Sequence, residues 1–154
     1  LVMGIGYVDS VIIYNRYIDG LMETETYYGT RFDGVRVELT QGNQIATTGN
    51  QNADACVVKI PAAVTGGKYL PPKQWEERQN KSDVFTFDKD NKDFYVIVKK
   101  PLLGIDIELP TGAVDSEAYQ NGFFQYVSTK YGYAYQVSTV DVYELVPRFE
   151  IGGK

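Results

Sequence analysis

The last third of the chain decides the fold. Its sequence is SEAYQNGFFQYVSTK (residues 116–130), YGYAYQVSTVDVYEL (131–145) and VPRFEIGGK (146–154). In the first segment, apolar side chains recur every four positions at Tyr119, Phe123 and Val127, which predicts an amphipathic helix over Ser116–Lys130. Gly122 inside this helix costs roughly 1 kcal/mol relative to alanine, so we expect the helix to depend on packing.

The segment after this helix is expected to be a long strand. Gly132 is a natural stop for the helix, and Tyr133–Leu145 is rich in the tyrosine and valine that favour strands. Its apolar residues hold odd positions at first and even positions later. This predicts a β-bulge at Ser138-Thr139 or burial on both faces. The chain ends on Phe149–Lys154, so we expect the C-terminus to belong to the fold.

The first part of the chain predicts three further strands. Val8–Ile18 and Met22–Tyr28 flank the turn signal Asp19-Gly20 and are expected to form a hairpin. Glycines at positions 29 and 34 then interrupt the pattern. After them, apolar residues alternate with charged ones at Val35, Val37 and Leu39, which predicts a separate half-buried strand.

The middle of the chain alternates strands with short irregular segments. We expect strands at Ala53–Ile60, Val84–Phe87 and Phe94–Val98, and the unbroken apolar run of the last one predicts cover on both faces. Prolines open a short helix or turn at Lys73–Gln79. Leu102–Leu109 is a candidate edge strand.

Together these elements predict one domain over residues 1–154. It is mainly β, built as a barrel or a sandwich, with one α-helix in the C-terminal half and a long polar loop at Gln41–Asp54. The loop has no apolar period and contains several Gly and Asn. It is either a solvated hairpin tip or a segment that orders against a partner.

Composition favours protein interfaces over nucleic-acid binding. The chain holds 13 Tyr, and tyrosine suits both half-buried sheet positions and protein interfaces. Residues 68–100 carry eight Lys/Arg and six Asp/Glu, about +2, whereas the remainder carries seven and fourteen, which gives −7. An acidic body argues against general nucleic-acid binding and leaves room for docking between oppositely charged protein surfaces.

The residue types that most enzymes need are missing. The sequence contains no histidine, which excludes histidine acid–base catalysis and most zinc and iron sites. Cys56 lies in an apolar run and is expected to be a buried small hydrophobe. No phosphate-binding glycine loop is present. We therefore expect no enzyme activity, no catalytic or metal site and no cofactor.

Two acidic patterns are candidates for a calcium site or a catalytic site. Residues 88–93 (DKDNKD) begin like a calcium loop, but Lys92 and Lys99 stand where that loop needs an oxygen ligand and a glutamate, so a polar turn is expected. The pairs Glu23/Glu25 and Asp106/Glu108 have the two-residue spacing common on exposed strands and are not expected to be catalytic. No secretion signal or membrane span is visible, and Leu1 leaves open whether it is the native start.

Three stretches resemble small proteins of tailed-phage head completion, the head–tail stopper or minor capsid type of the neck. Residues 9–17 (DSVIIYNRY) resemble an opening "D-x-V-T-I-Y-N-x-Y" strand, and residues 29–35 (GTRFDGV) resemble the "T-x-I-x-G-V" that follows it. Near the C-terminus, residues 137–140 (VSTV) and 149–154 (FEIGGK) resemble "V-x-S-V" and "H-W-K-V-G-G-K". Phe149 and Glu150 depart from the aromatic-basic pair of the family.

The resemblance implies a small β-barrel with a helix and an extended loop. It implies a homo-oligomeric ring, often a hexamer, in the virion neck between the portal or connector and the tail, built in the host cytoplasm. Partners would be further copies of the chain, the connector and the tail-terminator or other tail proteins, with channel contact to DNA that reads no sequence and with no membrane.

We assign interface roles on this basis to three segments. Gln41–Asn52 is a channel or neighbour loop, Gly67–Lys81 contacts a neighbouring subunit, and Val146–Lys154 closes the interface. The candidate residues are Gln41, Asn43, Gln44, Gln51, Tyr69, Trp75, Arg78, Arg148, Phe149 and Lys154. Trp75 has an alternative role, which is to anchor a surface element onto the core.

Two other functions remain open from the sequence. The chain could be a different virion part, such as a tail-terminator or tail-tube subunit, since a helix followed by a C-terminal strand suits that role too. It could also be a carbohydrate- or peptide-binding β-module that uses exposed tyrosines, for which a concave tyrosine-lined groove would be the sign.

Overall fold

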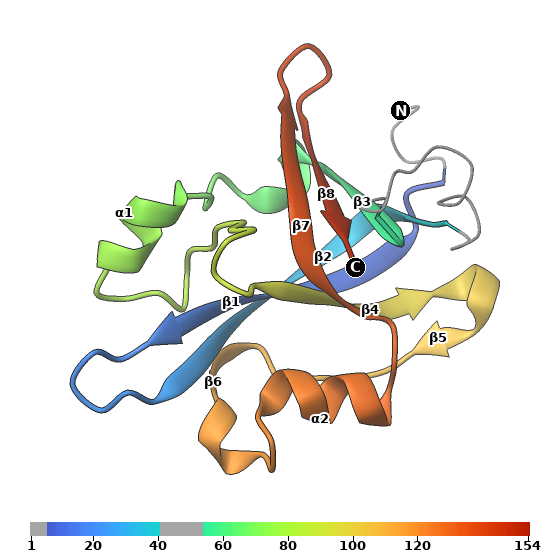
Figure 1. Cartoon of the computed structure of the whole chain (residues 1–154). Helices are drawn as coiled ribbons and strands as arrows, with labels where there is room; N and C mark the ends of the chain where they lie inside the picture. Colours follow the sequence, from blue (N-terminus) through green and yellow to red (C-terminus); the bar gives the residue numbers. More distant parts are fainter. Residues whose placement is uncertain (1–5, 41–53) are drawn as a thin grey trace, which may run out of the picture.

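The computed structural model describes residues 6–40 and 54–154. Within them, six antiparallel strands close into a barrel, because each pairs with the next and the last pairs with the first (Figure 1). In order around the barrel they are β1 (Asp9–Ile18), β2 (Glu25–Leu39), β3 (Cys56–Pro61), β8 (Arg148–Gly153), β7 (Ala134–Tyr143) and β4 (Phe94–Lys100). The predicted mainly-β fold is confirmed.

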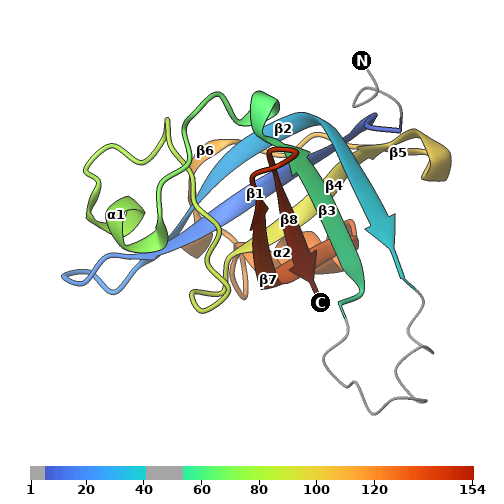
Figure 2. The ribbon, with the colours of Figure 1, turned by 90° about the horizontal axis from the view of Figure 1, so that it is seen from above.

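Shorter elements decorate the barrel. The two-residue strand β5 (Ile105–Asp106) extends β4, and β6 (Gly112–Asp115) pairs with β2. The helices are α1 (Pro72–Glu77) and α2 (Phe123–Lys130), with 3₁₀ turns η3 (Ala62–Thr65), η4 (Pro101–Leu103) and η5 (Ser116–Ala118). Seen from above, α1 and the β4–β5 hairpin lie on opposite sides of the molecule (Figure 2), as they do in Figure 1.

Two hydrophobic cores share the central strands. The inner core fills the barrel and includes Val11 and Ile97, and the outer core lies between the barrel wall and α2 and includes Ile12 and Val96. Alternate residues of β1 and β4 enter opposite cores because strand side chains alternate between faces. The predicted cover on both faces of β4 is therefore confirmed.

The C-terminal helix is shorter than predicted. It begins at Phe123 and follows a separate 3₁₀ turn, because Asn121 and Gly122 have φ of 64° and 89°, which a continuous right-handed helix does not allow. The Ser116 hydroxyl accepts a 2.9 Å bond from the Phe123 N–H and so satisfies one of the free donors at the helix start. The β-bulge predicted in the last long strand is confirmed, since the β7–β8 register shifts between Val137 and Thr139.

The glycines of the first third do not divide the chain into two strands, so that prediction was wrong. β2 runs through both of them, although it starts at Glu25, three residues later than predicted. At Gly29 a Cβ atom would stand 2.7 Å from the Tyr14 ring, so this glycine lets the ring lie flat on the strand. Gly34 has φ of 74° beside a register shift between β1 and β2, which bends the strand and keeps it continuous.

Two smaller predictions were also wrong. Residues 84–87 are not a strand, and Phe85 makes only an isolated bridge to Tyr69. Their apolar side chains enter the inner core from a loop that covers one end of the barrel. The candidate edge strand at residues 102–109 shrinks to β5, because η4 turns the chain first and Gly104 adopts a left-handed conformation.

Candidate interaction surfaces

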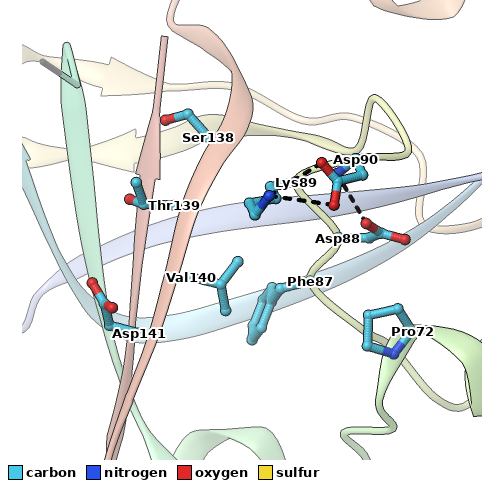
Figure 3. Close-up of a pocket in the computed structure, with 9 residues that line it drawn as sticks. All are labelled: Pro72, Phe87, Asp88, Lys89, Asp90, Ser138, Thr139, Val140 and Asp141. Carbon is cyan, nitrogen blue, oxygen red and sulfur yellow. Dashed lines mark hydrogen bonds and ion pairs between the residues drawn. The ribbon is translucent and has the colours of Figure 1, made fainter. Parts of the chain in front are cut away.

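One of the grooves of the described chain, called the main groove below, lies between a turn and the side of β7. It has a volume of about 440 Å³. Figure 3 shows residues 87–90 and Pro72 on one side and residues 138–141 on the other. Its apolar lining comes from Val140, Pro72 and the edge of the buried Phe87, and Asp88, Asp90 and Asp141 add three carboxylates. Lys89 pairs with Asp90 at 3.2 Å.

A buried polar network fixes the turn side of the groove. The Asn15 side chain donates to the Thr86 carbonyl at 2.6 Å and to Asp93 Oδ2 at 2.9 Å, and it accepts a 3.2 Å bond from the Thr86 N–H. Asp93 Oδ1 accepts from the Arg16 N–H at 2.8 Å. Burial raises the pKa of the Asp93 carboxyl to about 7, and the hydrogen bonds from Arg16 and Asn15 partly oppose that rise.

The β7 side is fixed by Asp54 and by glycines of β8. The hydroxyls of Ser138 and Thr139 both donate to the Asp54 carboxylate, the latter at 2.9 Å. Gly152 leaves the room for this, because a Cβ there would stand 2.0 Å from Asp54 Oδ2 and 2.2 Å from Thr139 Oγ1. Packing therefore explains why Gly152 and Gly153 are glycines, since a side chain at either position would collide with its neighbours.

Apolar side chains are exposed at three turns that project from the barrel. At the β1–β2 tip (residues 19–24), Leu21 is 95% exposed; at the β4–β5 turn (residues 100–104), Leu102 is 86% exposed; at the β7–β8 tip (residues 142–147), Leu145 is 97% exposed. Other large apolar residues accompany each leucine: Met22, Leu103, and the trio Val142, Tyr143 and Val146. Contiguous exposed apolar patches are characteristic of interaction sites, so these three turns are candidate contact sites.

The sequence-predicted interface residues divide into separate groups. Tyr69 and Phe149 come together with Phe87, with ring centroids 4.9–5.7 Å apart, and pack on the inner core at the end of the barrel. Gln41, Asn43, Gln44 and Gln51 lie outside the described residues. Lys154 is exposed and its backbone pairs with Gln136.

Trp75 is buried, with 2% of its surface exposed. Its ring packs against Tyr17 and Tyr28, and the Lys81 ammonium lies 5.4 Å from it. Burial favours the alternative role of this residue, in which it anchors α1 onto the β1–β2 hairpin. Direct contact between the indole and a partner needs exposed ring surface, which this arrangement does not offer.

The two candidate arginines are held by local contacts. Arg78 is exposed, donates to the Asn80 carbonyl at 3.1 Å and lies 3.4 Å from Asp83. Arg148 pairs with Glu150 at 2.8 Å, and its guanidinium lies over the Tyr143 ring at 4.3 Å. Arg148 therefore stiffens the base of the β7–β8 tip.

Reasoning from the sequence missed the exposed leucines. Leu102 and Leu103 were placed at the start of an edge strand, yet they stand between Pro101 and Gly104, and a Pro-x-x-Gly frame is typical of a turn. A leucine pair inside a turn signal was the available clue. Leu145 was placed inside the last strand, which in fact ends at Tyr143.

The described residues include one buried cysteine and no cluster of metal-ligating side chains. Within residues 6–40 and 54–154, no group of three or more His, Cys, Asp or Glu side chains could hold a metal ion. Cys56 is buried, and burial raises the pKa of its thiol to about 11, which keeps it protonated at neutral pH. None of the helices in this part of the chain has the length and apolar character to cross a bilayer.

Comparison with known proteins places the chain in one family. A family model described as a family of unknown function, DUF6751, matches residues 7–154. The chain belongs to this family. No curated protein sequence and no solved structure shows significant similarity to it.

Proposed function

We propose that this chain is a structural subunit of a tailed-phage neck, a head–tail stopper that forms a ring between connector and tail. The observation that carries the proposal is the placement of exposed leucines on three projecting turns of a closed barrel. A closed barrel has no long free sheet edge for random association, so its contacts come from turns, loops and outer faces. Three separate apolar turns suit a subunit that touches several neighbours at once.

The resemblance to head–tail stopper proteins is the reason for proposing that this assembly belongs to a phage neck. Its first two stretches lie in the paired strands β1 and β2, and its last two lie in β7 and β8. The resembling residues are therefore the ones that build the barrel wall. This pattern supports a shared fold with the stopper family, and the shared fold supports the shared role.

The binding-module alternative receives less support. A carbohydrate or peptide module was expected to show a concave groove lined with tyrosines. The main groove of the described chain is lined by proline, phenylalanine, valine and polar side chains, and a second hollow, on α2, includes a single tyrosine, Tyr126.

The test is the position of the chain in the particle. Cryo-EM of the neck of a phage that encodes this chain, with native mass spectrometry of the purified protein, gives ring size and location. We expect a closed ring directly beneath the connector. A ring stacked on the tail tube away from the connector would assign the tail-terminator role instead, and absence of the chain from particles would overturn the proposal.

A further inference from the structure

The β4–β5 turn is a rigid apolar projection. Pro101 opens it, Gly104 closes it with φ of 69°, and the Gly104 N–H donates to the Pro101 carbonyl at 3.1 Å. This geometry holds Leu102 and Leu103 outward, with 86% and 45% of their surfaces exposed. A projection fixed in this way loses little conformational entropy when it docks.

The turn and the adjoining end of β4 also carry an exposed cation, Lys99, whose charge helps lower the pKa of the Asp33 carboxyl. Lys99 is exposed, and no ion pair involves it among the residues that the structure describes. Lys100, by contrast, is held by Asp9 at 3.1 Å and donates to the Val37 carbonyl at 2.9 Å. The turn therefore presents two leucines and one available ammonium group.

The main groove has the complementary character. Val140 and Pro72 give it half-buried apolar surface, and its lining includes Asp88 and Asp141, neither of which forms an ion pair within residues 6–40 and 54–154. The volume of about 440 Å³ falls within the range of sites that enclose small ligands, so it admits leucine side chains. A partner that offers leucines to the apolar lining and a lysine to the carboxylates would complement both parts of the groove.

Groove and turn cannot meet within one chain. The groove borders the residues just before β4, and the turn follows the last residue of β4. The groove also borders α1 through Pro72, and α1 lies on the opposite side of the molecule from the β4–β5 turn (Figures 1 and 2). The complementary surfaces therefore belong to different copies.

We propose that the β4–β5 turn of one copy docks into the main groove of a second copy, an inference that rests on the proposed ring assembly and names its subunit contact. Leu102 and Leu103 lie against the half-buried Val140 and Pro72, and Lys99 faces Asp88 and Asp141. The contact joins two different patches, so it is heterologous and propagates head to tail. Such a contact generates a ring when the rotation between copies closes.

A labelling experiment tests the contact even when it is weak. The double variant Leu102→Asp/Leu103→Asp, labelled with ¹⁵N, keeps its groove but lacks a docking turn. Unlabelled wild-type chain is added up to about 1 mM, a concentration that detects binding of about −4 kcal/mol. We expect saturable amide shifts confined to residues 87–90 and 138–141. The matched control adds the unlabelled double variant, which should shift nothing.

A pair of charge-reversal variants then tests whether Lys99 of the docking turn faces Asp141 of the groove. Unlabelled Lys99→Glu chain should bind the labelled groove up to about fivefold more weakly, since an exposed ion pair contributes at most about 1 kcal/mol. Placing Asp141→Lys on the labelled chain should restore the affinity. All these positions are exposed, so each variant should keep the wild-type amide spectrum elsewhere.

The outcomes separate this inference from the proposed function. Absence of shifts with wild type, or equal shifts with the double variant, overturns the docking contact, while a neck ring seen by cryo-EM would still stand. Specific shifts from a chain that is absent from particles would keep the contact and overturn the neck assignment.

Discussion

Strand β4 and the tip of the β7–β8 hairpin both carry apolar side chains, yet the surroundings of these side chains differ. Residues 94–98 of β4 are fully buried, whereas Val142 and Leu145 at the end of the hairpin are 58% and 97% exposed. β4 has the inner core on one face and α2 with its neighbours on the other. Apolar residues in β4 therefore stabilise the fold, and those at the hairpin tip are available to a partner.

The largest expected effect on stability is at a buried residue of β4. Phe94→Ala should lower the free energy of unfolding by about 3–5 kcal/mol, because large-to-small changes leave a cavity in a core. Phe94 stacks on Tyr14 with ring centroids 5.0 Å apart and contacts the Phe124 ring at 4.8 Å. Urea unfolding followed by circular dichroism measures the change.

The matched control for this variant is Val142→Ala on the hairpin. An exposed position of this kind should change the stability by no more than about 0.5 kcal/mol. Similar losses for the two variants would remove the distinction between the regions.

Strand β4 and the loop at residues 84–87 show which features the sequence can predict and which it cannot. The unbroken apolar run in β4 predicted a strand covered on both faces, because five consecutive buried side chains leave no wet face. The run of residues 84–87 looked similar but is a loop, since its phenylalanines pack in the inner core and the Thr86 backbone pairs with the side chain of Asn15, 71 positions away. Local pattern identifies burial in both cases, and only long-range contacts decide strand or loop.

The surface features were harder to predict for a different reason. The groove depends on residues 87–90 and 138–141 lying opposite each other, and nothing local brings these segments together. Trp75 was given an interface role as well as an anchoring one, because its charged neighbourhood is typical of a surface. The aromatic contacts from Tyr17 and Tyr28 that bury it come from another part of the chain.

The second prediction concerns the place where the two regions meet. Gly153 of β8 packs on β4, and a Cβ there would stand 2.6 Å from the Tyr95 hydroxyl and 2.7 Å from Tyr135 Cβ. Gly153→Ala should therefore cost about 1–3 kcal/mol, because the overpacked neighbours have to shift. The same urea experiment measures it.

Gly20→Ala is the matched control for this glycine. Nothing lies within 4 Å of a Cβ at Gly20, so its effect should stay within about 0.5 kcal/mol. A tolerated Gly153→Ala would mean that the hairpin can move away from β4 without cost.

The third prediction concerns Asp93, just before β4. Burial raises the pKa of this carboxyl from its usual 3.8 to about 7. Between these values the folded chain keeps a proton that the unfolded chain has released, so stability falls as pH rises across this window. The contribution is at most about 1.4 kcal/mol per pH unit. Asp93→Asn stays neutral and should flatten the fall in unfolding free energy between pH 5 and 7.

The control for this titration is Asp90→Asn, an exposed carboxyl of the same turn. It removes one negative charge from the turn and leaves the buried network of Asn15 and Asp93 in place. Parallel curves for wild type and Asp93→Asn would show that another group controls the pH dependence.

The smallest expected effect on stability is at the tip of the hairpin. A substitution there should impair assembly while the free energy of unfolding stays unchanged. Leu145→Ser removes a side chain that touches almost nothing in the described chain, so the free energy of unfolding should stay within about 0.5 kcal/mol of wild type. In the proposed neck ring, the same change exposes a polar group where an apolar contact is expected, and fewer particles should retain the chain.

Quantitative mass spectrometry of purified particles measures that retention, and Lys73→Ser on the exposed face of α1 serves as a control away from the three tips. If Leu145→Ser lowered stability instead, the tip would be packing on its own barrel. If it changed neither stability nor retention, the exposed leucine of the β7–β8 tip would have no role in assembly, and the contacts of the ring would fall to the other two projecting turns.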